Sequence, residues 1–406
     1  MPQPREGRRA TSDEQASRSL NIQRFFESKR AAAVFKHAIL SGYVVPFASK
    51  TGSASTGNRV VIVDGYAGAG RYDSGESGSP ALIAAAARGL HGRSLECFFV
   101  EKDAQMYERL CSVLAEEDGS TVRWEALRGT VEEHLNAILQ RAEGLPLFIF
   151  LDPFGLGLPF DVIVNVFKRR PRGPYVPATE VLFRFDAGAI RRIRGVLHSD
   201  RDYSARAGTI MALDRAAGGT WWRDNDKLSL NNKQYVDWFM SQLLDRICKE
   251  AKCSGWSTEV WQRQDLQPVY YLVFLTRHRE GLRVFGEALS LAADKWRRAV
   301  FDEAVASVAG SGQDMLMDPD ELFKHEEQQL AAQWEIRLER NIRSLLQHHE
   351  SFIVGQRYDE VFEGVLGLPR IKHLRVVLKK LHVDGVTSSD SKGALFDKHV
   401  TRAQNA

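Results

Sequence analysis

Apolar residues along the chain fall into short runs separated by segments with helical spacing. The runs lack the alternation of a half-exposed strand, which indicates strands buried on both faces of a parallel sheet. Each run is followed by a stretch that suits a helix, so strands and helices alternate. The runs are RVVIVD, LECFFVE, TVRWEALR and LPLFIFL, with ATEVLFRFD and QPVYYLVFLTRH as later strands. The pattern predicts a doubly wound α/β sheet.

Helix boundaries are marked most clearly after the first apolar run. In GSPALIAAAARG, Ser79 can cap a helix, Pro80 suits its first position and Gly89 can end it. The stretches AQMYERLCSVLAEE and VEEHLNAILQRAEG predict two more helices between the strands.

Changes in composition divide the chain into four segments. Residues 1–20 are polar and mixed in charge, which predicts a flexible tail. Residues 21–307 form the predicted sheet domain, with a mostly helical insertion at about 196–262. Residues 308–321 have the composition of a linker, and residues 322–406 combine helical stretches with a Gly/Ser-tipped ribbon. That order predicts a winged helix, and an ordinary helical cap gives nearly the same pattern.

Composition changes this picture little but excludes several classes of protein. The 406 residues are 44% hydrophobic and 26% charged, as in globular chains rather than disordered or fibrous ones. We expect a cytoplasmic protein, because no apolar run approaches the roughly 20 residues of a membrane helix and the polar start does not resemble a secretory signal. The four cysteines are dispersed, so we expect neither a metal site nor disulfides; they are Cys97, Cys111, Cys248 and Cys253. The net charge of +3 leaves nucleic-acid affinity to local basic patches.

Candidate chemistry begins where the first strand ends, in DGYAGAG at 64–70. Gly68 and Gly70 allow the backbone to approach a ligand, and the Asp64 carboxylate can accept hydrogen bonds from an amino group. A dinucleotide fingerprint needs a third glycine where Asp73 stands and a helix directly after it. The turn therefore suits S-adenosylmethionine, whose amino-acid end is zwitterionic. A purely structural glycine turn fits equally well.

Two later strand ends extend the predicted cofactor site. Glu101 ends the second strand, where a carboxylate can accept both ribose hydroxyls of a nucleoside. Gly129 and Thr130 follow the third strand and would border the adenine ring. A solvated acid at a strand end is the alternative for Glu101.

The fourth strand ends in Asp152, Pro153, Phe154 and Gly155. A carboxylate held by a proline beside an aromatic ring suits transfer of a methyl group to an amine. The acid would orient the amine while the ring stacks on the substrate. Most of the rate would then come from near-attack geometry. An ordinary strand-ending Asp-Pro turn is the alternative.

Taken in order, these motifs resemble the three-Cys-motif partner proteins (TcmP). The segments that carry the resemblance are VIVDGYAGAGRY, GESGSP, FFVEKD, FIFLDPFG, GGTWW and YYLVFLTRHREGL, spread over about residues 30–300. The resemblance implies a Rossmann-like methyltransferase that uses S-adenosylmethionine and works with a partner protein carrying three cysteines. A more distant similarity is to the RlmJ-type ribosomal RNA adenine amino-methyltransferases.

The family resemblance also implies roles for individual residues. Asp152, with Pro153 and Phe154, would face the target amine, and Lys36 and His37 would lie near the cofactor loop. The residues that would bind or border the cofactor are Asp64, Tyr66, Ala67, Gly68, Gly70, Glu101, Lys102, Gly129 and Thr130.

The sequence departs from the RNA enzymes at the catalytic motif. Those enzymes carry Asp-Pro-Pro-Tyr or a close variant, whereas this chain has one proline and Gly155 in place of the stacking ring. A protein or small-molecule acceptor therefore stays open beside nucleic acid.

Two groups of basic residues bear on the acceptor. The first follows the fourth and fifth strands and could contact phosphates, or form a solvated basic surface or an interface with an acidic protein; its members are Arg169, Arg170, Arg172, Arg191, Arg192 and Arg194. The second would lie on the recognition helix of the winged helix, or on the exposed face of an ordinary amphipathic helix; it comprises Arg370, Lys372, His373, Arg375, Lys379 and Lys380.

These observations favour a methyltransferase that transfers a methyl group from S-adenosylmethionine to an amine or other heteroatom of nucleic acid. The alternative is a catalytically altered methyltransferase-like module that binds nucleotide or nucleic acid and recruits a second protein. A nicotinamide-dependent oxidoreductase is disfavoured by the glycine spacing.

Overall fold

The computed structural model describes most of the chain and contains the predicted doubly wound sheet. The described residues are 35, 37–73, 75–116, 122–153, 155–156, 158–169, 176–197, 206–224, 227, 229–260, 267–310 and 318–404, the side chains of 307–310 excepted. Seven strands are ordered β3-β2-β1-β4-β5-β7-β6. Their bounds are β1 Arg59–Asp64, β2 Ser94–Glu101, β3 Val122–Arg128, β4 Leu147–Leu151, β5 Thr179–Asp186, β6 Ser254–Val260 and β7 Tyr270–Thr276.

Strand order reverses once, between β1 and β4. The chain runs outward from β1 through β2 to β3, then returns to the other side of β1 with β4 and continues to β5. These five strands pair in parallel, whereas β7 is antiparallel to both β5 and β6. Ligands of open α/β sheets bind at the carboxyl ends beside such a reversal.

Strand β6 lies where we expected only helices. Its sequence, SGWSTEV, has Trp256 and Val260 as its buried residues, because it forms an edge of the sheet and pairs with β7 alone. An edge strand with mostly polar positions gives no apolar run, so the pattern missed it. The expected insertion therefore contributes helices and one strand of the sheet.

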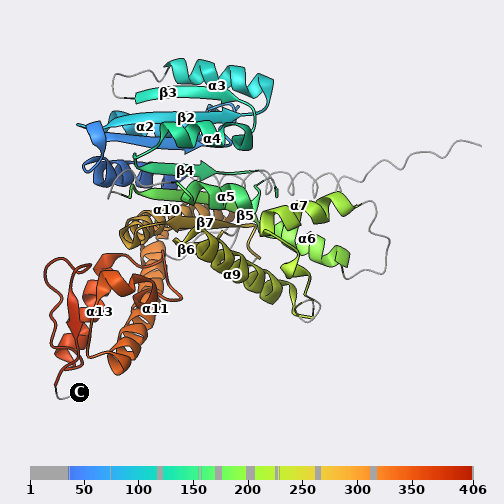
Figure 1. The fold of residues 1–406 in the computed structure, drawn as a ribbon. Coiled ribbons are helices and arrows are strands. Elements are labelled where there is room, and N and C mark those ends of the chain that lie inside the picture. The colour runs from blue at the N-terminus through green and yellow to red at the C-terminus, as the bar shows by residue number, and fades with distance from the viewer. Residues whose placement is uncertain are drawn as a thin grey trace, which may run out of the picture.

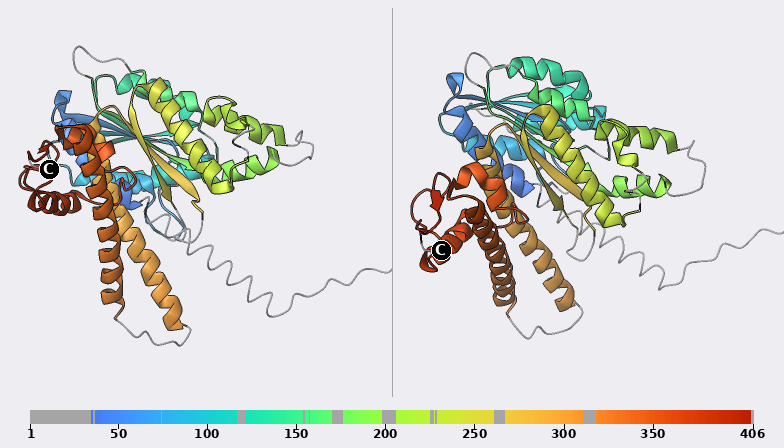
Figure 2. Two further views of the ribbon diagram at one scale, coloured as in Figure 1. Left: turned by 90° about the horizontal axis from the view of Figure 1, so that it is seen from below. Right: turned by 60° about the horizontal axis from the view of Figure 1, so that its bottom comes forward.

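Helices cover both faces of the sheet (Figures 1 and 2). One face packs against the helical residues 37–52 and against α2 Ser79–Arg88, α3 Ala104–Glu116 and α10 Arg279–Gly310. The opposite face packs against α4 Val131–Arg141, α5 Phe160–Phe167, α6 Ala187–Leu197, α7 Ala207–Ala217 and α9 Asn232–Ala251. The expected helix after the first strand is α2, with Pro80 in its first turn and Gly89 at its end. The prediction of Ser79 as its cap is wrong, because Gly78 occupies that position and Ser79 is the first residue of the helix.

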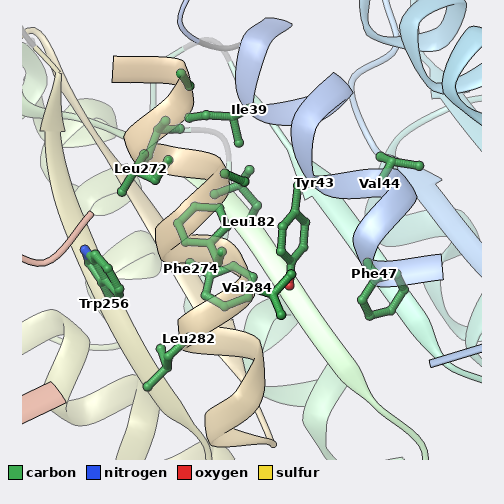
Figure 3. Packing of buried hydrophobic residues seen from close by; sticks show 14 of the residues in the cluster. Ile39, Tyr43, Val44, Phe47, Leu182, Trp256, Leu272, Phe274, Leu282 and Val284 are labelled. Carbon is green, nitrogen blue, oxygen red and sulfur yellow. The ribbon is translucent and has the colours of Figure 1, made fainter. Parts of the chain in front are cut away.

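Aromatic side chains join the sheet to the first helix and to α10 (Figure 3). The ring of Tyr43 meets Phe148, Phe274 and Phe285 at centroid distances of 5.4, 5.5 and 5.3 Å. Phe274 and Phe285 stack in parallel at 4.1 Å. Such pairs add specific geometry to the burial of apolar area, which fixes the two helices on this face.

Residues beyond Asp318 form helices and a small ribbon. The elements are α11 Pro319–His348, β8 Ser351–Ile353, η4 Val354–Arg357, α12 Tyr358–Val361, α13 Ile371–Val383 and β9 His399–Thr401. The short 3-10 segments earlier in the chain are η1 Thr56–Asn58 and η3 Trp221–Arg223. Strands β8 and β9 pair antiparallel. Trp334 and Leu338 of α11 belong to the same hydrophobic cluster as Phe274 of the sheet. Within the part of the chain described, no helix is both long and apolar enough to cross a membrane.

A carboxylic acid of strand β5, Glu180, is buried between the sheet and the first helix. Glu180 is 3% exposed and accepts hydrogen bonds from the Tyr43 hydroxyl and, at 3.1 Å, from the Thr276 hydroxyl. Burial raises the pKa of Glu180 from 4.5 to about 7, although the two hydrogen bonds oppose this shift. The buried side chain therefore binds its proton more tightly in the folded than in the unfolded protein.

This difference predicts that stability falls as the pH rises from about 4.5 through about 7. Over that range the native state holds a proton that the unfolded state has lost, so deprotonation favours unfolding, by roughly 3 kcal/mol in total. Glu180→Gln removes the titration and flattens this part of the profile. Urea denaturation at pH 5 and pH 8 measures both proteins, and parallel profiles would contradict the assignment.

Candidate functional site

Three acidic residues follow neighbouring strands at the carboxyl edge of the sheet. In the register, Asp64 of β1 lies level with Phe99 of β2 and Phe150 of β4. Glu101 and Asp152 each come two residues later on those strands. Adjacent strands lie about 4.8 Å apart and rise about 3.3 Å per residue, so Asp64 sits lower than the two flanking acids. The reversal of strand order, between β1 and β4, lies among these three strands.

The turn after β1 crosses this edge in a fixed path. The Gly65 amide donates to the Phe150 carbonyl of β4, and the Ala67 amide donates to the Val100 carbonyl of β2, both at 2.9 Å. A β-carbon on Gly65 would lie 2.5 Å from Leu151 Cδ2. A side chain at position 65 would have to displace Leu151, because the turn passes close to the end of β4.

The two predicted ligand glycines have different surroundings. Both have positive φ, +62° at Gly68 and +77° at Gly70. A β-carbon on Gly70 would lie 3.1 Å from Val113, so this glycine allows the turn to pack on α3. A β-carbon on Gly68 would meet no atom within 4 Å. Only Gly68 therefore leaves open space above the backbone for a ligand.

Glu101 holds the turn in place. Its Oε2 accepts the Gly68 amide at 2.8 Å, and its Oε1 accepts the Asp103 amide at 2.8 Å. Each carboxylate oxygen can accept a further hydrogen bond. The side chain can thus fix the glycine turn and still receive the ribose hydroxyls for which it was predicted. The first of these roles gave no signal in the sequence.

Asp64, the last residue of β1, lies below the surface of this edge. The residue is fully buried and its Oδ1 accepts the Tyr66 amide at 3.1 Å. The pKa of the Tyr66 phenol is raised by burial and, to a smaller extent, by the negative charge of Glu132. Tyr66 therefore stays neutral and can act as a hydrogen-bond donor at the edge.

The remaining predicted cofactor residues surround this turn. His37 Nε2 lies 3.5 Å from the hydroxyl of Tyr72, which follows the glycine turn, whereas Lys36 lies outside the described residues. Lys102 is exposed directly after Glu101. Thr130 precedes α4 and its amide donates to Glu133 Oε2 at 2.8 Å. A β-carbon on Gly129 would lie 2.8 Å from His134 Nε2, so Gly129 and Thr130 shape the start of α4.

Asp152 has a neighbour that the motif did not reveal. Its Oδ1 lies 3.5 Å from Arg184 Nη1, and the Arg184 guanidinium stacks over the Tyr270 ring at 4.6 Å. Pro153 is buried, and Phe154 lies outside the described residues. Phe183 pairs with Leu151, so the β4–β5 register places Arg184 beside Asp152. Aligning the two strands in parallel would have revealed Arg184 as the neighbour of Asp152.

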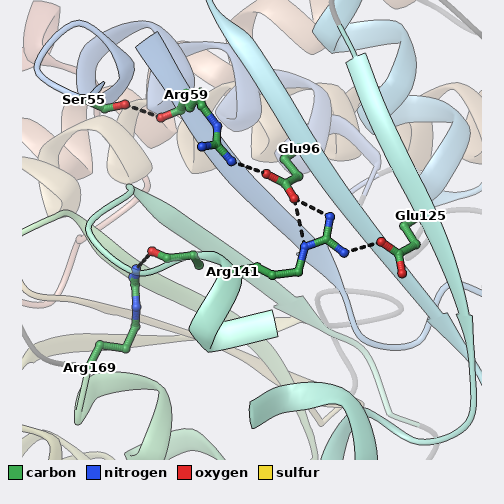
Figure 4. Close-up of polar contacts among 7 residues, drawn as sticks. Ser55, Arg59, Glu96, Glu125, Arg141 and Arg169 are labelled. Atoms are coloured by element: carbon green, nitrogen blue, oxygen red, sulfur yellow. Dashed lines mark hydrogen bonds and ion pairs between the residues drawn. The ribbon is translucent and has the colours of Figure 1, made fainter. Parts of the chain in front are cut away.

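The predicted phosphate-binding arginines separate into two kinds. Arg169 donates to the carbonyls of Ala142 and Leu145 at the amino ends of the strands, far along the sheet from the acids (Figure 4). Arg194 donates to Asn232 and to the Leu230 carbonyl and is 8% exposed. Both guanidinium groups thus donate to oxygen atoms of the protein itself, and their contact with nucleic acid stays a prediction.

The other four arginines of this group were also predicted to contact phosphates of nucleic acid. Arg191 donates to the Pro268 carbonyl at 2.8 Å. The Arg192 side chain is 72% exposed, with Asp186 3.9 Å away. Arg170 and Arg172 lie outside the described residues. Within the described part of this group, Arg192 is thus the member with an open guanidinium.

Helix α13 exposes fewer charges than its sequence suggests. Arg370 pairs with Asp294 at 2.9 Å, and Lys380 pairs with Glu339 at 2.7 Å. His373 is buried, and burial lowers its pKa to about 4. Arg375 donates to the Ser391 and Gly393 carbonyls, which leaves Lys372 and Lys379 as exposed amines on the helix.

No group of three or more metal-binding side chains gathers within the described segments.

No family model matches the chain, and no curated protein matches it. Among solved structures, similarity is found to M. jannaschii TYW2 in complex with AdoMet, with 10% identity over 56% of this chain and 73% of that chain, at a TM-score of 0.26. The small RNA methyltransferase HEN1 is similar at 12% identity over 57% of this chain and 25% of that chain, with a TM-score of 0.31. The doubly wound sheet with its antiparallel β7 is the Rossmann-like α/β fold that the sequence predicts.

The contact between Glu101 and Gly68 gives a direct prediction. Glu101→Ala removes a charged acceptor, and hydrogen bonds to charged groups contribute about 1.5–3 kcal/mol. We therefore expect the Gly68 amide to exchange its hydrogen roughly tenfold to a hundredfold faster, as measured by hydrogen exchange. Glu96→Ala is the control on the same strand, because Glu96 pairs with Arg59 and Arg141 away from the turn (Figure 4). Equal exchange rates at Gly68 in the wild-type protein and both variants would contradict the role of Glu101 in holding the turn.

Proposed function

We propose that the protein is an S-adenosylmethionine-dependent methyltransferase that acts on an amino group or other heteroatom of nucleic acid. The observation that supports it is the convergence of Asp64, Glu101 and Asp152 on three adjacent strand ends at the reversal of strand order. A cytoplasmic location and a partner with three cysteines, both expected from sequence, belong to the same proposal.

The residues at this edge fit the cofactor in shape and in hydrogen bonding. Gly68 offers open space beside a backbone held by Glu101. The Glu101 oxygens retain capacity for two hydroxyl groups. Asp64 is fully buried and supports the turn through the Tyr66 amide, which places its carboxylate below the proposed cofactor space. When bound, S-adenosylmethionine supplies an electrophilic methyl group on a sulfonium centre.

Asp152 and its surroundings are suited to orient the acceptor. A carboxylate can accept hydrogen bonds from an amine, which holds the nitrogen lone pair in one direction. Arg184 lies 3.5 Å away and fixes the carboxylate from the side of β5. Orientation of the acceptor is the main contribution such a site makes, because in-line transfer depends on near-attack geometry.

The same ion pair favours a second candidate. An arginine already beside Asp152 competes with an incoming amine, and the Asp-Pro-Phe-Gly motif lacks the stacking ring of the RNA enzymes. The protein would then bind nucleotide or nucleic acid without methylating it and recruit a second protein. Transfer of labelled methyl groups to any cellular fraction distinguishes the two.

Cofactor binding is tested by a pair of glycine substitutions. Gly68→Ala places a methyl group in the predicted cofactor space, whereas Gly92→Ala adds one at a similar φ, +67°, with no atom within 4 Å, in an exposed loop. Both variants strain the backbone equally, by about 1 kcal/mol. We expect calorimetry to show at least tenfold weaker binding of S-adenosylhomocysteine to Gly68→Ala alone. No binding to the wild-type protein at millimolar ligand would reject the cofactor.

The role of Asp152 is tested by separating binding from transfer. Asp152→Asn keeps the shape but removes the charge, so we expect transfer of radiolabelled methyl groups to fall at least a hundredfold. Affinity for S-adenosylhomocysteine should change less than threefold. Asp73→Asn is the control, because Asp73 is an exposed acid that pairs with Arg109 of α3. Separated RNA, DNA and protein fractions show which acceptor is labelled, and a mainly weakened cofactor affinity would contradict the role.

A further inference from the structure

A cavity of about 460 Å³ opens next to the turn that carries Asp152. One wall is the β4–α5 turn, at Gly155, Leu156 and Pro159, and the other walls are α6 and α7. Three consecutive Cα–Cα steps separate Asp152 from Gly155, so the cavity begins at most about 11 Å from the predicted catalytic residue. A ligand held there can extend to the sheet edge.

The polar lining of the cavity is cationic. Arg192 of α6 and Arg215 of α7 enter it from two helices, together with the Thr209 hydroxyl. The rest of the lining is small or apolar, and includes Ala189, Gly208 and Ala212. Small residues leave room near the two guanidinium groups for a ligand atom to approach.

Charge compensation within the protein is weak at this position. Asp186 lies 3.9 Å from Arg192 but also accepts the Ala189 amide at 2.8 Å, where it begins α6. Among the described residues no carboxylate pairs with Arg215, which is exposed. An anion bound in the cavity would be attracted by both cationic side chains that line it. Planar guanidinium groups favour phosphate geometry in particular.

We propose that this cavity binds a backbone phosphate of the nucleic-acid acceptor, adjacent to the nucleotide presented to Asp152. The inference rests on the proposed function and adds a subsite to it. Arg192 and Arg215 contact the phosphate and Thr209 donates its hydroxyl. The site contributes affinity without reading sequence, as phosphate contacts do.

The test measures binding of a fluorescent single-stranded oligonucleotide by anisotropy, with S-adenosylhomocysteine present, over a range of salt concentrations. We expect Arg192→Gln/Arg215→Gln to bind at least tenfold more weakly at 0.1 M salt. The slope of log affinity against log salt should decrease in magnitude by about 0.7 for each phosphate that the variant no longer neutralises. Arg192→Lys/Arg215→Lys keeps the charge and should retain most of the slope.

A charge-matched control separates the cavity from a general loss of positive charge. Arg123→Gln/Lys249→Gln removes two exposed cations, one on β3 and one on α9, and should leave the binding curve unchanged. Equal losses in the two double variants, or no oligonucleotide binding by the wild-type protein, would overturn the proposal. If a mononucleotide competes as well as the oligonucleotide, the phosphate belongs to a free nucleotide and the proposed nucleic-acid strand is rejected as the ligand.

Failure of the subsite and failure of the proposed function give different results. If the wild-type protein does not bind S-adenosylhomocysteine but the arginine variant still loses oligonucleotide affinity, the phosphate site stands and the cofactor assignment falls. If the arginine variant binds S-adenosylhomocysteine normally and keeps its oligonucleotide affinity, the subsite alone is rejected. Normal cofactor binding also shows that the variant is folded.

Discussion

Two hydrogen bonds from backbone amides to one carboxylate determine the shape of the candidate site. Glu101 accepts the Gly68 amide from the turn after β1 and the Asp103 amide from its own chain segment, both at 2.8 Å. The carboxylate therefore connects the end of β2 to the turn that crosses from β4 to β2. The connection fixes Gly68 at the tip of the turn, while the Gly65 and Ala67 amides hold the start of the turn on β4 and β2.

Much of the fold follows from the sequence because the buried strands of a parallel sheet have a simple signature. Val60 to Val63 and Phe148 to Leu151 are continuously apolar, and both segments are strands. Strand β6 shows the limit of this reasoning. At the sheet edge its polar residues are half-buried, so its pairing with β7 depends on tertiary contacts that leave no periodic pattern.

The candidate site was predictable in part, for a related reason. Parallel register places Asp64, Glu101 and Asp152 at one edge, and the sequence motifs already indicate that edge. Side-chain partners are a different matter. Arg169 and Arg192 look equivalent in the sequence, yet Arg169 reaches internal carbonyls while Arg192 is exposed at a cavity. A long flexible side chain reaches partners from distant segments, which the local sequence does not encode.

The junction between the sheet and the C-terminal helices contains a cavity. Trp256 of β6, Trp296 of α10 and Trp334 of α11 line a mainly apolar cavity of about 800 Å³ there. Atoms that border a void lack the dispersion contacts they would have in a filled core. The three indole rings each border this space, so a change in how α11 packs against the sheet alters their surroundings, and indole fluorescence reports it.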